Sequence, residues 1–160
     1  MNTFEDYIED LCRQHPLIRH EADGKCHFSL LTDDSQTRFA QTMRYPCVVL
    51  DVGDFNFSGQ PGHVQIDTEF SILFLEHVRD TGNSQDVQQA FSTTRSILLD
   101  FARKFSRDKR ALKHQFLARF ELIGSEGHRL YFKDAGLYGY ALFFNNNESF
   151  SDADCDHIFD

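Results

Sequence analysis

Residues 64–78, VQIDTEFSILFLEHV, contain the clearest secondary-structure pattern in the sequence. From Val64 to Phe74 every second side chain is apolar, except Thr68, and the positions between them up to Ser71 are polar. A period of two is typical of a β-strand with one buried face. Fifteen residues at ~3.3 Å each would extend about 50 Å, more than an ordinary strand. We therefore expect a strand that bends or projects beyond its own domain.

A long amphipathic helix is expected after this strand, from a cap at Ser84 to about Phe105. Its apolar stripe comprises Val87, Ala90, Phe91, Thr94, Ile97, Leu98, Phe101 and Phe105. Phe91, Ile97, Leu98 and Phe101 should pack on a sheet that contains Phe70, Ile72 and Phe74 of the strand. A shorter helix is predicted over residues 3–14, capped by Thr3 and ended by Pro16.

Further strands are expected on both sides of the long helix. Their predicted ranges are 26–32, the run CVVLDV opened by Pro46, 116–123, 128–132 and 138–144, with residues 124–127 as a hairpin loop. Residues 37–44 are either strand or loop, residues 55–62 (FNFSGQPG) have the composition of a loop, and residues 107–115 are either a helical extension or a loop. The segregated order of elements favours an α+β fold: a mainly antiparallel β-sheet, with one long helix packed on a face and a short N-terminal helix. We expect one domain, 1–145, and an acidic C-terminal tail, 146–160.

Charge is unevenly distributed along the 160 residues, whose net charge is −9. Residues 103–119 hold seven basic side chains and one acid, Asp108, whereas no basic residue follows Lys133. The acidic total argues against non-specific or sequence-specific nucleic-acid binding. The two charged segments are either a solvated loop and tail, or complementary patches suited to head-to-tail contacts between copies.

No pattern in the sequence predicts a catalytic or metal site, and no cofactor is implied. Asp152, Asp154 and Asp156 resemble the first ligands of a calcium loop, but His157 replaces the next glycine and the twelfth-position glutamate is missing. The four cysteines form no C-x-x-C pair, so we expect free thiols. No apolar run suits a membrane helix and the acidic start is unlike a signal peptide, so we expect an intracellular protein.

Aromatic residues near loops or glycines are the candidates for an interaction surface. We expect Phe55, Phe57, Tyr138 and Tyr140 to act as interface anchors. The candidate interface also includes three cations of the basic segment, Arg107, Lys109 and Arg110.

Four segments carry a family resemblance: YPCVVLD (45–51), DTEFSILFL (67–75), YFKD (131–134) and LYGYALFF (137–144). Together they resemble small proteins encoded in prophage-like tail clusters of Bacteroidetes, which are similar to the phage tail terminator, or tail completion, family. The resemblance covers residues 37–145. It implies a helix against an antiparallel sheet, and a ring of six copies that caps the tail tube. Implied partners are other copies, the tail tube protein and head-tail connector proteins, in the bacterial cytoplasm or the virion.

Three functional hypotheses follow. The first is a ring-forming structural protein of a phage-like tail. The second is an α+β adaptor domain that binds another protein without catalysis. The third is a small enzyme or ligand-binding domain, which a concave pocket with convergent polar groups would favour.

Overall fold

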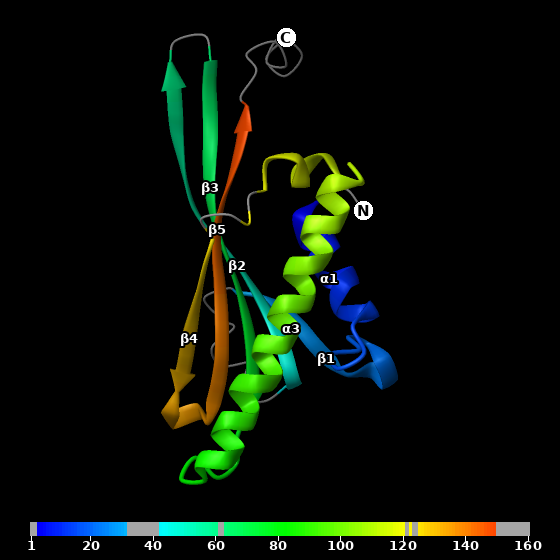
Figure 1. Cartoon of the computed structure of the whole chain (residues 1–160), viewed down its shortest axis with the longest axis vertical. Coiled ribbons are helices and arrows are strands. Elements are labelled where there is room, and N and C mark those ends of the chain that lie inside the picture. Colours follow the sequence, from blue (N-terminus) through cyan, green and yellow to red (C-terminus); the bar gives the residue numbers. More distant parts are fainter. Residues whose placement is uncertain (1–2, 32–41, 61–62, 121, 123–124, 150–160) are drawn as a thin grey trace.

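Five strands form one sheet in the order β1-β2-β3-β5-β4 in the computed structural model (Figure 1). The structure describes residues 3–31, 42–60, 63–120, 122 and 125–149. The strands are β1 (Cys26–Leu30), β2 (Met43–Gln60), β3 (His63–His77), β4 (Glu126–Phe132) and β5 (Leu137–Ser149). All neighbours pair antiparallel except β1 and β2. Helices α1 (Phe4–Gln14) and α3 (Ser84–Arg110) lie on one face, so the predicted α+β fold is confirmed.

Both helices begin at a side-chain cap. The Thr3 hydroxyl accepts a hydrogen bond from the Asp6 backbone N–H at 3.1 Å, as predicted for α1. The cap of α3 is Asn83 rather than Ser84, since the Asn83 side chain accepts from the Gln85 N–H at 3.0 Å. The helix then continues to Arg110, so the first part of the basic segment is helical.

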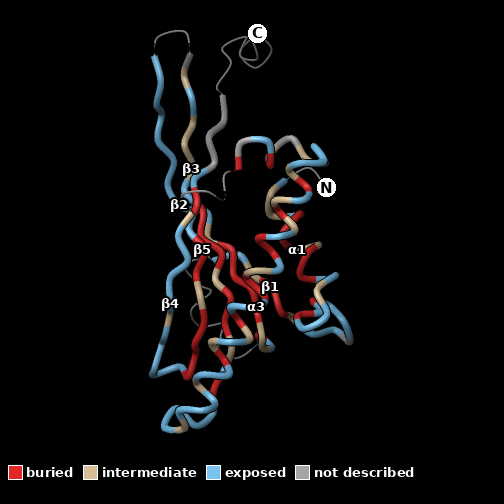
Figure 2. The backbone as a smooth tube through the Cα atoms, viewed as in Figure 1, coloured by how far each residue is buried: buried red, intermediate tan, exposed pale blue. Residues whose placement is uncertain are grey.

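The main core lies between the helices and the sheet (Figure 2). Its members from α3 include Ile97, Leu98 and Phe101, and its members from β3 are Phe70, Ile72 and Phe74, as predicted. Phe91 packs on β5, the neighbour of β3 in the same sheet, with its ring 5.8 Å from that of Tyr138, which is also as predicted. The helix stripe and the strand alternation therefore meet as expected over most of their length.

The apolar run of β2 is buried on both faces of the sheet. Val48 and Leu50 belong to the helix-side core, whereas Cys47 and Val49 belong to a second cluster with Leu75. A strand buried on two faces has no polar alternation, which explains the continuous apolar run. The strand begins at Met43, three residues before the predicted start at Pro46, so the described end of the ambiguous stretch 37–44 belongs to the strand. Residues 37–41 lie outside the described part.

Beyond the helices, β2, β3 and β5 continue as a projecting three-stranded arm, defined here as residues 52–60, 63–69 and 145–149 (Figure 1). The overlong strand therefore projects rather than ending at the domain edge. The predicted loop at 55–62 was wrong as far as Gln60, because these residues pair with β3 from Phe55↔Thr68 to Gln60↔His63. Residues 61 and 62 lie outside the described part.

The end of the sheet also differs from the predictions. In the expected strand at 116–123, residues up to Arg119 belong to a short 3-10 helix, η2 (Gln115–Arg119), and residues 121 and 123 lie outside the described part. In the expected hairpin loop at 124–127, Glu126 and Gly127 belong to β4, and residue 124 is not described. Strand β5 runs to Ser149, which takes residues 146–149 of the expected tail into the sheet. The remainder of that tail lies outside the described residues.

Close packing of β3 against β5 requires the glycine of the Tyr-Gly-Tyr sequence, Gly139. A Cβ atom at this position would lie 1.8 Å from the Phe74 carbonyl oxygen of the neighbouring strand. Any side chain would therefore force β3 and β5 apart beneath α3.

Replacing Phe101 by alanine tests the packing of α3 on the sheet. Phe101 is 2% exposed and contacts Phe74 at a ring distance of 5.2 Å. Phe101→Ala should lower the free energy of unfolding by about 3–5 kcal/mol in denaturant titration. Phe132→Ala, which removes a ring that is 47% exposed, is the matched control and should cost far less. A loss below about 1 kcal/mol at Phe101 would contradict this packing.

Candidate interaction surfaces

The arm presents two aromatic side chains on one face. Phe55 is 59% exposed and Phe57 is 63% exposed, and their rings lie edge to face at 5.8 Å. Directly paired residues share a face, so the pairs Phe55↔Thr68 and Phe57↔Ile66 place both rings on the face that carries Phe70. The apolar face of the sheet thus continues past the helices that cover it in the body.

The arm also has two open edges. Among the described residues, strand pairing on the outer edge of β2 ends at Leu50, and pairing on the outer edge of β5 ends at Phe143. An edge strand without a neighbour offers backbone N–H and C=O groups to another chain. Each copy therefore has one such edge on β2 and a different one on β5.

The two tyrosines predicted as interface anchors lie in the part of β5 that is outside the arm. Tyr138 is 6% exposed and packs with Val78 and Ala90 beneath α3, so it is a core residue and not a surface anchor. Tyr140 is half-buried, and its hydroxyl accepts a hydrogen bond from Arg129 Nε at 3.2 Å. Sequence proximity to Gly139 suggested exposure, but that glycine serves close strand packing.

Asp108, the one acid of the basic segment, is a buried counter-ion that joins α1 to α3. It is 1% exposed, and Tyr7 of α1 donates a hydrogen bond to its Oδ2 at 3.0 Å. Lys104 contacts the same oxygen, and Lys113 Nζ lies 3.3 Å from Oδ1. Burial alone would raise the pKa of Asp108, but the hydrogen bonds from Lys104 and Tyr7 and the ion pair with Lys113 outweigh it and hold the pKa below its usual range.

The three predicted interface cations fall into two groups. Lys109 donates to the carbonyl oxygen of Phe120 and so fixes the segment after η2 against α3. Arg107 and Arg110 are exposed and line a cleft between α1 and α3. Part of the basic segment is therefore neutralised or used inside the fold, and the remaining positive charge is concentrated at this cleft.

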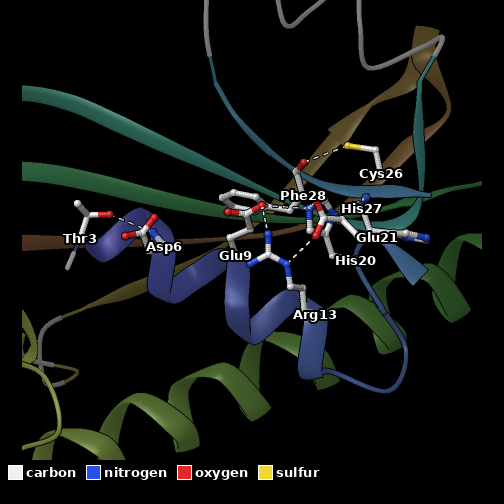
Figure 3. A network of polar contacts seen from close by, with 9 residues as sticks. All are labelled: Thr3, Asp6, Glu9, Arg13, His20, Glu21, Cys26, His27 and Phe28. Atoms are coloured by element: carbon white, nitrogen blue, oxygen red, sulfur yellow. Dashed lines mark hydrogen bonds and ion pairs between the residues drawn. The ribbon is translucent and has the colours of Figure 1, made fainter. Parts of the chain in front are cut away.

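A second polar network joins α1 to the turn before β1 (Figure 3). Arg13 bridges two carboxylates, with Nη2 at 2.7 Å from Glu9 Oε1 and Nε at 2.8 Å from Glu21 Oε2. His20 Nε2 lies 3.3 Å from the same Glu9 oxygen, and its Nδ1 accepts from the His27 backbone N–H at 3.1 Å.

Glu9, His20 and Glu21 have the residue types and proximity of a metal site, yet their bonding favours a structural role. Because His20 Nδ1 accepts a hydrogen bond, the neutral ring carries its proton on Nε2, the atom that a metal would need. Arg13 already balances the charge of both carboxylates. The group is therefore an ion-pair clamp between α1 and the following turn.

Comparison with protein-family models, curated proteins and solved structures finds no match. Within the described part of the chain, every helix is too short or too polar to cross a membrane.

Neither polar network was predicted from the sequence. The spacing of Lys104 and Asp108, four residues apart in a helix, signals an ion pair, but Tyr7 lies 101 residues from Asp108. The Glu9–Arg13 pair has the same four-residue spacing, whereas Glu21 and His20 join it only through the tertiary fold.

Removing the Asp108 carboxylate should destabilise the joint between the helices. Asp108→Asn should lower the free energy of unfolding by about 3 kcal/mol, because it breaks a buried ion pair. Tyr7→Phe should cost about 1.5 kcal/mol, since it removes one hydrogen bond to a charged group. Denaturant unfolding measures both values.

The pH dependence follows from the lowered pKa of Asp108. The stabilisation is fully present above the pKa of the unfolded chain, about 4, and is lost as pH falls through the lower pKa of the folded state. Wild type should therefore lose its advantage over Asp108→Asn on acidification. An advantage that is unchanged from pH 7 to pH 2 would contradict this account.

Chelator and reductant test the interpretation of the Glu9 cluster and of the thiols. Because Arg13 balances the carboxylates, EDTA should leave the melting temperature unchanged, and reductant should do the same because Cys12, Cys26 and Cys47 are free. Scanning calorimetry is the measurement. A decrease of several degrees with either reagent would refute the corresponding assignment.

Proposed function

We propose that this protein is a ring-forming structural subunit of a phage-like tail, of the tail terminator kind, and that its arm makes the contacts between copies. The observation that carries the proposal is the arm itself: three strands extend beyond the helix layer with Phe55 and Phe57 exposed on one face. An exposed apolar face continuous with a core indicates a surface that is covered by another molecule.

The open edges explain how such contacts would generate a ring. The β2 edge of one copy and the β5 edge of the next are different surfaces, so their pairing is heterologous. When such a contact repeats from copy to copy and the rotations add up to a full turn, the copies form a closed ring in which each subunit uses both edges once. Backbone pairing fixes the angle between copies, and the aromatic face adds apolar burial.

Further properties suit the expected place in a tail. The net charge of −9 would let DNA pass through a ring without adhering to its subunits. The tail tube protein and the head-tail connector proteins are the proposed neighbours above and below the ring. An adaptor that takes a strand from a different protein would use the same open edges, so oligomeric mass distinguishes the two functions.

Light scattering coupled to size exclusion tests the proposal. We expect a discrete oligomer, about 112 kDa for six copies of 18.6 kDa, that forms as concentration rises. Phe55→Ser combined with Phe57→Ser should shift the protein to monomer while its circular dichroism is retained, because both rings lie outside the core.

Leu112→Ser is the matched control, since Leu112 is 80% exposed but lies after α3, away from the arm. It should leave the oligomer intact. A wild-type monomer at the highest soluble concentration, with and without the tube protein, would overturn the ring and favour the adaptor.

A further inference from the structure

A cleft of about 400 Å³ lies between the C-terminal half of α3 and the end of α1. Its lining includes three apolar side chains, Leu11, Pro16 and Phe101, called here the floor, together with four cations and the carboxylate of Asp100. The cations come from one stripe of α3 and are Arg103, Lys104, Arg107 and Arg110. The cleft thus combines an apolar floor with a positively charged wall.

The cations are not all neutralised within the subunit. Arg103 pairs with Asp100 at 2.8 Å, and Lys104 pairs with the buried Asp108. Arg110 donates through Nε to the Ser106 carbonyl oxygen at 3.3 Å, and Arg107 forms no ion pair with any described residue. Net positive charge therefore remains at the C-terminal end of the wall.

His15 places an unused hydrogen-bond donor inside the cleft. Its side chain is 9% exposed, and its Nδ1 accepts from the Leu17 backbone N–H at 3.3 Å, so the neutral ring carries a proton on Nε2. Burial lowers the pKa of His15, which keeps the ring neutral near pH 7, although Asp100 partly offsets this effect. Nε2 has no hydrogen-bond partner among the described residues, and the nearest acid, Asp100, lies 3.5 Å away. This donor is therefore open to a closer acceptor from a ligand, in competition with the Asp100 carboxylate.

The sequence of this chain contains a segment with matching chemistry. Residues 150–160 (FSDADCDHIFD) have aspartates at 152, 154 and 156, followed by Ile158 and Phe159. In an extended segment these aspartates would recur every ~6.6 Å on one side. Along α3, Arg103, Arg107 and Arg110 are separated by rises of about 6 and 4.5 Å. The charges can thus pair in series, and the apolar residues after them suit the cleft floor.

The position of the arm points to the copy that supplies this segment. Residue 149, the last of β5, pairs with Gln65 in the arm, so residues 150–160 begin at the arm (Figure 1). In the proposed ring the arm lies against the next subunit, and eleven residues can extend up to ~36 Å from it. We propose that the cleft between α1 and α3 binds the acidic C-terminal segment of the neighbouring copy, an inference that rests on the proposed ring. The charge pairs would then give direction to an assembly held mainly by the arm.

Disulfide trapping tests this inference on the full chain. Gln14 is exposed at the cleft, and Cys155 lies within the acidic segment, so Gln14→Cys supplies a thiol opposite a native one. Oxidation with copper phenanthroline should give a ladder of covalent oligomers ending at the mass of the ring. Peptide mapping of mixed ¹⁴N and ¹⁵N copies should show position 14 joined to Cys155 of a different copy. Gln88→Cys, exposed near the start of α3, is the matched control and should give no ladder.

The rate of disulfide trapping tests the proposed charge pairs separately. In the Gln14→Cys chain, Arg107→Glu should slow trapping about fivefold at low salt, and adding Asp154→Lys should restore the rate. Wild-type charges should trap more slowly as salt rises from 0.1 to 1 M. A destabilised fold would not be rescued by the second substitution.

The outcomes separate this inference from the ring. An intact ring without the 14–155 linkage overturns the docking of the segment and leaves the ring standing. A linkage within one copy overturns the neighbour as its source. A monomeric chain overturns both proposals.

Discussion

The stacked rings of Phe70 and Phe144 mark the limit of what the helices can cover. Their centroids lie 5.5 Å apart on paired residues of β3 and β5, and Phe4 of α1 contacts both. On one side of this pair the sheet is buried beneath α1 and α3, and on the other side the same strands continue as the arm (Figure 2). The sheet is thereby divided into a covered body and an exposed arm, because the strands remain paired beyond the part that the helices cover. The proposed assembly therefore depends on backbone pairing that the body begins and a second copy would complete.

Charge has two separate uses in this fold. The Asp108 and Arg13 networks hold α1 against α3 and against the turn before β1, and in both the charges are paired within the subunit. The exposed cations Arg107 and Arg110 remain at the cleft between the same helices. Internal pairing thus fixes the geometry of the cleft wall, while the remaining cations are available to a ligand. A run of basic residues in the sequence therefore does not by itself predict a positive surface, because a buried acid such as Asp108 can neutralise part of it.

The sequence predicts elements well where burial imposes a period. Alternation from Val64 to Phe74 predicts β3 and its excess length, because one face must meet a helix. The arm part of β2 was mistaken for a loop because its stability comes from pairing with β3 rather than from burial, which leaves Gly, Ser and Asn acceptable. At 115–119 the apparent alternation was misleading, since the buried Leu117 and Phe120 are three residues apart, a spacing that suits a 3-10 turn. Tyr138 and the Asp108 network depend on contacts between distant segments, which no local pattern contains.

Backbone hydrogen exchange of the arm shows whether the open strand edges pair between copies. Amides of residues 52–60 on the open edge of β2 should exchange quickly in dilute solution and at least tenfold more slowly in the assembled protein, because a neighbouring strand would then accept their hydrogen bonds. Amides of β3 in the body should show the same protection in both conditions, since that strand is already paired on both sides. Assembled protein whose arm amides exchange as fast as those of the monomer would contradict the account and place the contacts between copies elsewhere.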